Sequence, residues 1–304
     1  MPGTGRNQPP CRLLPTIAGL NTTVNPQQKL RVLGVILDPG LTMVEHVVKL
    51  RERIFLKMAR LKPVSGSIFG PKLDDMRTLY MTSVRPLISY ACGAWYTEGH
   101  AWSIHPLLIA ELEKIQHECL LTIAGAYKST EYDVLLKELC IDSVGIYLRR
   151  TAAAFRARSI NTPLDEMLRA RRNGVNDTVV DHPYKLGDLT ARLLLDSVRL
   201  RTATVEPEFT KQTRLANAIK SATQEDAFSE SSARWTRFRR EYNNRPGRSS
   251  HPYFPALLED WGWESLGFYE NKNRAQCTML MACRTGRIGL NKYLYHSRVS
   301  VCDT

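Results

Sequence analysis

The sequence predicts a mainly α-helical protein, in which a short β-strand or hairpin precedes a helical bundle. Three observations support this fold class. A β-branched run at residues 31–37 is closed by Asp38-Pro39-Gly40, a turn signal. From residue 42 onward, apolar residues recur every three or four positions, which is the spacing of an amphipathic helix. No later segment alternates in the way that a half-buried strand does.

The first predicted helix begins near Thr42, because Thr42 and Glu45 have the spacing of a capping box. Pro63 and Gly66 end it. Its apolar stripe consists of Val47, Leu50, Ile54, Met58 and Leu61.

A second helix is predicted to begin near Pro71 and to be kinked by Pro86. Its stripe consists of Leu73, Met76, Tyr80, Val84, Leu87 and Ala91. A third helix follows His105-Pro106 and stops at Gly125. Its stripe consists of Leu108, Leu112, Ile115, Cys119 and Ile123.

The remaining helices have shorter patterns. Thr130 and Asp133 are predicted to cap a helix through Leu139, and another runs from Ser143 to about Ser159. Thr162-Pro163 opens one more, with proline at its first position. Weaker patterns indicate helices at 189–202, 211–243 and 273–297, the last broken around Gly286–Gly289, with loops at 174–188 and 243–251.

This reading divides the chain into four parts. Residues 1–27 form a loose arm, and 28–174 form the strand and the main helical domain. Residues 175–250 form a weakly patterned helical extension, and 251–304 form a helical C-terminal segment. With 304 residues the chain is long enough for one large or two modest domains, each with its own core.

The charge of the chain favours an acidic polymer as its partner. There are 42 Lys and Arg residues against 30 Asp and Glu, a formal net charge of +12. Neutralising phosphates releases counterions, so such a balance suits nucleic acid. Seven scattered cysteines without a C-x-x-C pair favour a reducing compartment. No apolar stretch has membrane-spanning length, and the N-terminal residues lack the apolar region of a secretory signal. We therefore expect an intracellular protein, cytoplasmic or nuclear, without membrane contact. The oligomeric state is left open.

Four motifs stand in a fixed order over residues 28–160. The first is Leu33-Gly34-Val35-x-Leu37-Asp38, followed by His46. The second is Leu79-Tyr80-x5-Pro86-Leu87-x2-Tyr90-x2-Gly93-x-Trp95. The third is Leu112-x3-Gln116-x4-Leu121-x-Ile123-x-Gly125-Ala126-Tyr127. The fourth is the stretch Leu135–Ile141, which contains Glu138, with the arginine-rich helix through Arg158 after it.

In this order the motifs resemble the primer grip and thumb of reverse transcriptases from non-LTR retrotransposons. The resemblance marks Leu33, Gly34 and Val35 as primer-grip-like. A later segment is similar to the R-T-G-x-I-x-L run that precedes a zinc knuckle in fungal elements of this kind. That segment reads Cys283-Arg284-Thr285-Gly286-x-Ile288-Gly289-Leu290-Asn291-x-Tyr293-Leu294.

The resemblance implies an RNA-directed DNA polymerase origin, but the polymerising chemistry is not expected in this chain. Polymerisation needs carboxylates that hold two divalent ions. In the family these belong to a Y-x-D-D hairpin and an upstream Asp, all before the primer grip, and nothing here matches them. No acidic cluster of an RNase H domain is recognised either. We therefore expect a non-catalytic remnant with no cofactor of its own, because Mg²⁺ would belong to the missing palm.

The expected partner is a template–primer of RNA, RNA–DNA hybrid or DNA, held through its phosphates. The alternatives are a helical protein-interaction module and an inactive pseudogene product.

Two arginine clusters are the candidate binding residues. The first lies on the predicted 143–159 helix and continues beyond it: Arg149, Arg150, Arg156 and Arg158, then Arg169, Arg171 and Arg172. Such a surface grips phosphates without reading sequence. The second consists of Arg234, Arg237, Arg239, Arg240, Arg245 and Arg248, interleaved with Trp235, Phe238 and Tyr242. Arginine with aromatics suits single strands, where bases stack. The alternative is a solvated amphipathic face with a small apolar stripe.

Other chemistry-bearing residues are interpreted as structural. Adjacent Asp74 and Asp75 fall in the first turn of a helix, where carboxylates offset its dipole, and they point about 100° apart. His46 has no catalytic partner at useful spacing, so we expect it to pack or to stabilise a turn. Burial in the thumb core is favoured for Trp95 and Tyr96 over base stacking.

A zinc site near the C-terminus is not favoured. Four possible ligands, Cys277, Cys283, His296 and Cys302, are spaced more widely than in structural zinc sites. We expect Cys277 and Cys283 to project from different faces of one helix.

Overall fold

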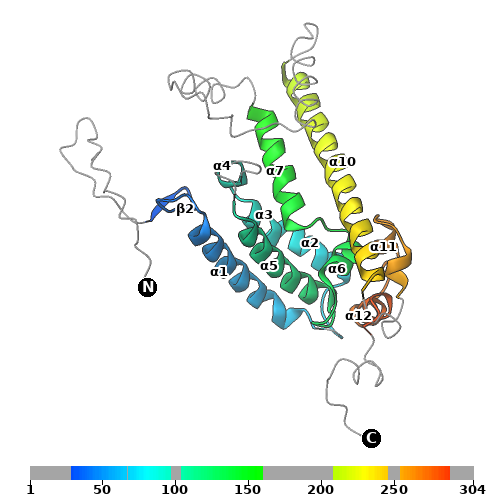
Figure 1. Ribbon diagram of the computed structural model, residues 1–304. Helices are drawn as coiled ribbons and strands as arrows, with labels where there is room; N and C mark the ends of the chain where they lie inside the picture. The colour runs from blue at the N-terminus through cyan, green and yellow to red at the C-terminus, as the bar shows by residue number, and fades with distance from the viewer. Residues whose placement is uncertain (1–28, 67, 97–103, 160–207, 246–253, 288–304) are drawn as a thin grey trace, which may run out of the picture.

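The structure, a computed structural model, describes residues 29–66, 68–96, 104–159, 208–245 and 254–287 (Figure 1). In this part the chain is mainly α-helical, and a two-stranded antiparallel sheet precedes the helices. The predicted fold class is therefore confirmed.

The β-branched run forms a hairpin. β1 (Leu30–Val32) pairs with β2 (Val35–Leu37), with Leu30 opposite Leu37. Leu33 and Gly34 join the strands with φ of +47° and +92°. Positive φ at both central residues is the geometry of a two-residue hairpin turn, which glycine favours. The β-element predicted at residues 31–37 is thus a hairpin, one of the two forms that the sequence indicated.

Helix α1 (Val44–Leu61) buries the predicted stripe Val47, Leu50, Ile54 and Met58. Its start differs from the capping box that was expected. The N-cap is Met43, with φ of +63° and no side-chain cap. Asp38 instead accepts hydrogen bonds from the backbone N–H groups of Thr42 and Met43 and from the Thr42 hydroxyl. A 3-10 turn, η1 (Lys62–Val64), follows.

The second predicted helix divides into α2 (Leu73–Leu79), a π-helical turn η2 (Tyr80–Val84), α3 (Arg85–Ser89) and α4 (Cys92–Trp95). The stripe is as predicted through Val84 and then shifts by one residue, so that Ile88 and Cys92 are buried in place of Leu87 and Ala91. The wider turn accounts for the shift. It lies directly before Pro86, which has no N–H to complete an α-helical hydrogen bond.

Helix α5 (Pro106–Ala124) begins at His105, whose side chain accepts a hydrogen bond from Leu107 N–H, and ends at Gly125 with φ of +65°. Helix α6 (Tyr132–Leu139) starts from Glu131 without a side-chain cap, so the predicted Thr130 cap is wrong. Helices α7 (Val144–Ser159), α10 (Glu208–Asn243) and α12 (Arg274–Arg284) were each predicted.

Between α10 and α12 lie η4 (Pro255–Leu258) and α11 (Glu264–Gly267), which were not predicted. The helix expected at Thr162-Pro163, the helix at 189–202 and the loop at 174–188 lie outside the described residues.

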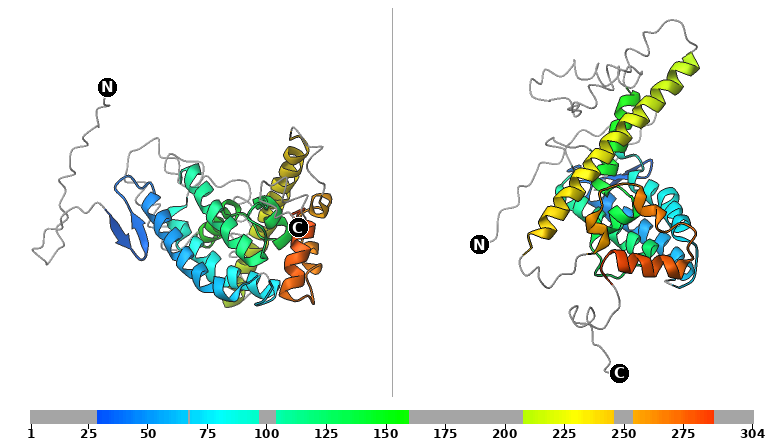
Figure 2. Two further views of the ribbon diagram at one scale, coloured as in Figure 1. Left: turned by 90° about the horizontal axis from the view of Figure 1, so that it is seen from below. Right: turned by 90° about the vertical axis from the view of Figure 1, so that its right-hand side faces the viewer.

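One apolar core includes residues from both halves of the chain. It joins side chains of residues 35–152 to side chains of residues 235–281. α10 packs along α7, and α12 packs against α5 and η4 (Figures 1 and 2). Among the described helices, none combines the length and the apolar composition needed to cross a bilayer.

Candidate nucleic-acid interface

The arginines of α7 are partly engaged inside the protein. Arg149 Nη1 lies 2.5 Å from Glu230 Oε1, and Arg150 Nη1 lies 3.2 Å from Asp142 Oδ2. Arg158 is exposed. Arg156 belongs to the helix, but its side chain is outside the description, as are Arg169, Arg171 and Arg172 altogether. Two of the predicted phosphate ligands therefore already contact carboxylates.

The arginines of α10 fall into two groups. Arg234 contacts both Asp133 (2.5 Å) and Glu113 (2.8 Å), Arg239 contacts Asp260 (2.7 Å), and Arg245 contacts Glu131 (2.9 Å). Arg237 and Arg240 are exposed, and neither side chain has a hydrogen bond or ion pair with another described residue. Arg248 lies outside the described residues.

The aromatic side chains of the second cluster are buried. Trp235 stacks on Phe238 at 5.5 Å between ring centroids, and Phe238 lies 5.8 Å from Tyr242. The Trp235 indole N–H donates to the Glu259 carbonyl at 2.9 Å. These rings are not available for stacking on bases, so that expectation is wrong. The alternative, an apolar stripe on an amphipathic helix, is confirmed for them.

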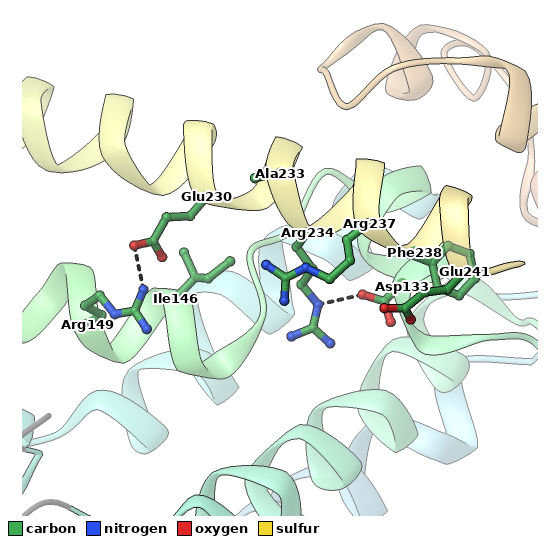
Figure 3. A pocket seen from close by; sticks show the side chains of 9 residues that line it. All are labelled: Asp133, Ile146, Arg149, Glu230, Ala233, Arg234, Arg237, Phe238 and Glu241. Atoms are coloured by element: carbon green, nitrogen blue, oxygen red, sulfur yellow. Dashed lines mark hydrogen bonds and ion pairs between the residues drawn. The ribbon is translucent and has the colours of Figure 1, made fainter. Parts of the chain in front are cut away.

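The two predicted clusters meet in a groove between α7 and α10, which we call the α7–α10 groove (Figure 3). Its volume is about 620 Å³. It is lined by Asp133, Ile146, Arg149, Glu230, Ala233, Arg234, Arg237, Phe238 and Glu241. The Arg149–Glu230 pair lies toward one end and the Arg234–Asp133 pair toward the other, and the Arg237 side chain reaches between them. The groove thus holds two internal ion pairs and one exposed guanidinium.

A second hollow lies on α10 away from its buried stripe, and we call it the outer α10 face. It is lined by Phe228, Ser229, Ser232, Ala233, Thr236, Arg237 and Arg240. Helical spacing places this set opposite Ser231, Trp235 and Phe238, which are buried. Three hydroxyl groups and two guanidinium groups face outward here, and the lining contains no carboxylate. These hydroxyl and guanidinium hydrogen-bond donors suit an anionic polymer.

The primer-grip-like residues form the tip of the hairpin. Leu33 is 87% exposed, whereas Val35 is buried. The Tyr90 hydroxyl donates to the Leu33 carbonyl at 2.8 Å, which ties the tip to the segment between α3 and α4. Contact between these residues and a primer strand stays a prediction.

His46 of α1 holds the hairpin against this helix. Ile36 N–H donates to His46 Nδ1 at 3.4 Å, and the ring packs edge-on against Trp95 at 5.2 Å. Burial, and then the nearby charge of Arg53, lower the pKa of His46 below its ordinary value. The packing role predicted for His46 is confirmed, as is the burial of Trp95 and Tyr96.

A buried network of charges was missed at the level of sequence. Arg284 binds both carboxylate oxygens of Glu138, at 2.7 and 2.9 Å, and also contacts Glu259 at 2.6 Å. Lys137 contacts Glu138 at 3.2 Å and also bonds Glu259, and the Tyr269 hydroxyl donates to Glu138 at 2.6 Å. Burial acts to raise the pKa of Glu259, but the bonds from Arg284 and Lys137 outweigh it and lower that pKa. Glu138 and Arg284 both stand in the motifs above, which was the available signal.

Two further arginines cap helices. Arg274 donates to the carbonyl groups of Thr122 and Ile123 in the last turn of α5, and Arg77 donates to those of Leu139 and Cys140 at the end of α6. Such carbonyls have no partner within their own helix. These arginines therefore support the fold and do not face a ligand.

The other candidate groups are placed as follows. Asp74 and Asp75 lie in the first turn of α2, as predicted. On α12, Cys277 is buried and Cys283 exposed, so they do project differently. His296 and Cys302 lie outside the described residues. Within the described ranges, no group of three or more His, Cys, Asp or Glu side chains could hold a metal ion.

The sequence is similar to a retrotransposon protein. It is 28% identical over 133 residues to the Retrovirus-related Pol polyprotein from type-1 retrotransposable element R1 4 of Nasonia vitripennis. The match covers 43% of this chain and 32% of that polyprotein, so the chain spans about a third of the length of this relative. No family model and no solved structure matches the chain. The similarity supports a retroelement origin.

Proposed function

We propose that this chain is the thumb-like part of a non-LTR retrotransposon Pol protein and that it binds template–primer nucleic acid without reading its sequence. The outer α10 face is the observation that carries the proposal. Its two unpaired arginines and three hydroxyl-bearing residues are the donors that proteins use on phosphate oxygens. The similarity to a retrotransposon Pol polyprotein and the formal charge of +12 support it. The R-T-G likeness favours an element of fungal type.

Binding through this face has a defined electrostatic signature. Each phosphate that a guanidinium neutralises releases counterions, and the slope of log affinity against log salt is about −0.9 per contact on duplex DNA. Arg237 and Arg240 together therefore contribute about two contacts to that slope. Hydroxyl donors from Ser229, Ser232 and Thr236 fix the backbone in place and leave the slope unchanged.

The test compares two double variants of equal charge change. Arg237→Gln with Arg240→Gln should lower affinity for a labelled primer–template and reduce the salt slope by about two. Arg60→Gln with Lys72→Gln removes the same charge from exposed positions on α1 and beside α2. This control should keep the slope. Fluorescence anisotropy over a salt series measures both quantities.

Two results would contradict the proposal. Equal losses in the two double variants would indicate non-specific attraction to a basic protein. Weak, salt-insensitive association of the unmodified chain would instead favour a protein-interaction module.

We also propose that this chain binds template–primer without polymerising. Its sequence contains no Y-x-D-D motif, and the one adjacent aspartate pair, Asp74-Asp75, occupies successive positions of α2 that point about 100° apart. In a primer-extension assay with Mg²⁺ we expect no incorporated nucleotide. Incorporation that survives controls for contaminating polymerase would overturn this part.

A further inference from the structure

We propose that Glu230 occupies a phosphate site in the α7–α10 groove, so that a backbone phosphate of the nucleic acid binds Arg149 by displacing this carboxylate. The inference rests on the proposed function and adds a residue pair to it. Glu230 would thereby set the affinity of the groove for its ligand.

The geometry of the groove suggests the exchange. Arg149 and Glu230 form an ion pair across the groove, from α7 to α10, at 2.5 Å (Figure 3). Both side chains remain partly open to solvent, 43% for Arg149 and 29% for Glu230. Ion pairs this exposed contribute little to stability, so a competing anion can replace the carboxylate. Phosphate offers guanidinium the same planar, two-point match as carboxylate does.

Arg237 provides the entry point. Its side chain reaches into the groove on the side of the Arg149–Glu230 pair, and it also lines the outer α10 face. A strand held on that face through Arg237 therefore lies at the mouth of the groove. A further phosphate of the same strand would enter the groove toward Arg149, where Glu230 is the anion that it would displace.

Arg234, the other ion-paired arginine of the groove, does not suit such an exchange. Arg234 is held by two carboxylates, Asp133 and Glu113, and its guanidinium lies 5.3 Å from the centre of the Tyr132 ring. Displacing one carboxylate would leave the other in place. The exchange is therefore not assigned to Arg234.

The experiment compares Glu230→Gln with Glu225→Gln. Glu225 lies on the same helix and is exposed, and among the described residues its side chain accepts a hydrogen bond only from Ser221 Oγ, at 3.3 Å. Its variant removes the same charge. We expect E230Q to bind a primer–template several-fold more tightly than E225Q, with a salt slope steeper by about 0.9.

The decisive readout is the dependence on Arg149. In an Arg149→Gln background the gain from E230Q should vanish, while any small gain from E225Q should persist. Equal gains from both glutamate variants, or a gain from E230Q that survives R149Q, would overturn the exchange. Circular dichroism of all variants reports whether each is folded. Absence of salt-dependent binding by the unmodified chain would sink the proposed function instead, so the two failures are distinguishable.

Discussion

At the scale of residues, two glycines of the sequence motifs mark places where helices touch. A Cβ at Gly93 would lie 2.3 Å from the Phe155 ring of α7, and one at Gly125 would lie 2.7 Å from Thr278 Oγ1 of α12. Gly125 also has the left-handed backbone that favours glycine. At both positions, close packing between helices leaves no room for a side chain, which accounts for the glycine.

The Gly93 contact gives a direct prediction. Gly93→Ala should destabilise the fold by about 1–3 kcal/mol, because the added methyl group overpacks against Phe155. Chemical denaturation measures the change. Phe155→Ala in the same chain should recover most of the loss, since it empties the space that the methyl group needs. Additive effects of the two substitutions would show that the contact is not the cause.

At the scale of elements, apolar periodicity predicted the helices well because their buried faces follow a regular spacing. The predicted stripes of α1 and α5 are buried except for Leu61 and Leu108, which are half-buried. Helix starts were harder to predict, since Asp38 binds the Thr42 and Met43 amides from outside the capping-box spacing. The π-helical turn could not be read from the pattern either, because one extra residue per turn shifts the stripe without any change in composition.

The docking of the hairpin on α1 should depend on pH. His46 accepts a hydrogen bond from Ile36 N–H through Nδ1, which only the neutral ring can do. Burial and the charge of Arg53 lower the pKa of His46 in the folded protein below its ordinary value of 6.5. The unfolded chain therefore binds more protons below about pH 6.5, and stability should fall as pH drops from there through the folded-state pKa.

Denaturation at several pH values tests the hairpin prediction. The His46→Gln variant, whose amide oxygen can accept the same hydrogen bond, should lose this part of the pH dependence. An unchanged profile in that variant would assign the dependence to other groups.

At the scale of the whole molecule, the segment after residue 254 shares its core with the helices of the first half. Glu259 joins three helices, since its side chain binds Lys137 of α6 and Arg284 of α12 while its carbonyl accepts from Trp235 of α10. Sequence alone could not pair Glu138 with Arg284, because 146 residues separate them and neither lies in an apolar stripe. The arginine clusters were found from sequence, but their division into paired and unpaired members depends on such distant contacts.

The buried network predicts a large effect from a single substitution. Arg284→Met should destabilise the fold by about 3–5 kcal/mol, because it leaves Glu138 and Glu259 with Lys137 as the remaining cation of the network. Arg240→Met removes an exposed arginine and should change stability by less than about 0.5 kcal/mol. Thermal and urea unfolding compare the two. A similar, small effect for both would mean that the network contributes little.

Acidic and basic side chains are unevenly distributed along α10, which affects how the proposed nucleic-acid ligand would approach the outer α10 face. Glu225 and Asp226 precede its arginines by at least eleven residues, which is about 16 Å along the helix axis. This separation exceeds the screening length of about 8 Å at physiological salt, so the two ends act on a distant polyanion as independent charges. Lys220 lies near the acidic pair, so the charges at that end of α10 partly cancel, whereas Arg237 and Arg240 stand together at the other end. For the proposed nucleic-acid ligand we expect association to begin at the Arg237–Arg240 end, so that α10 would direct the approach of a strand as well as contact it.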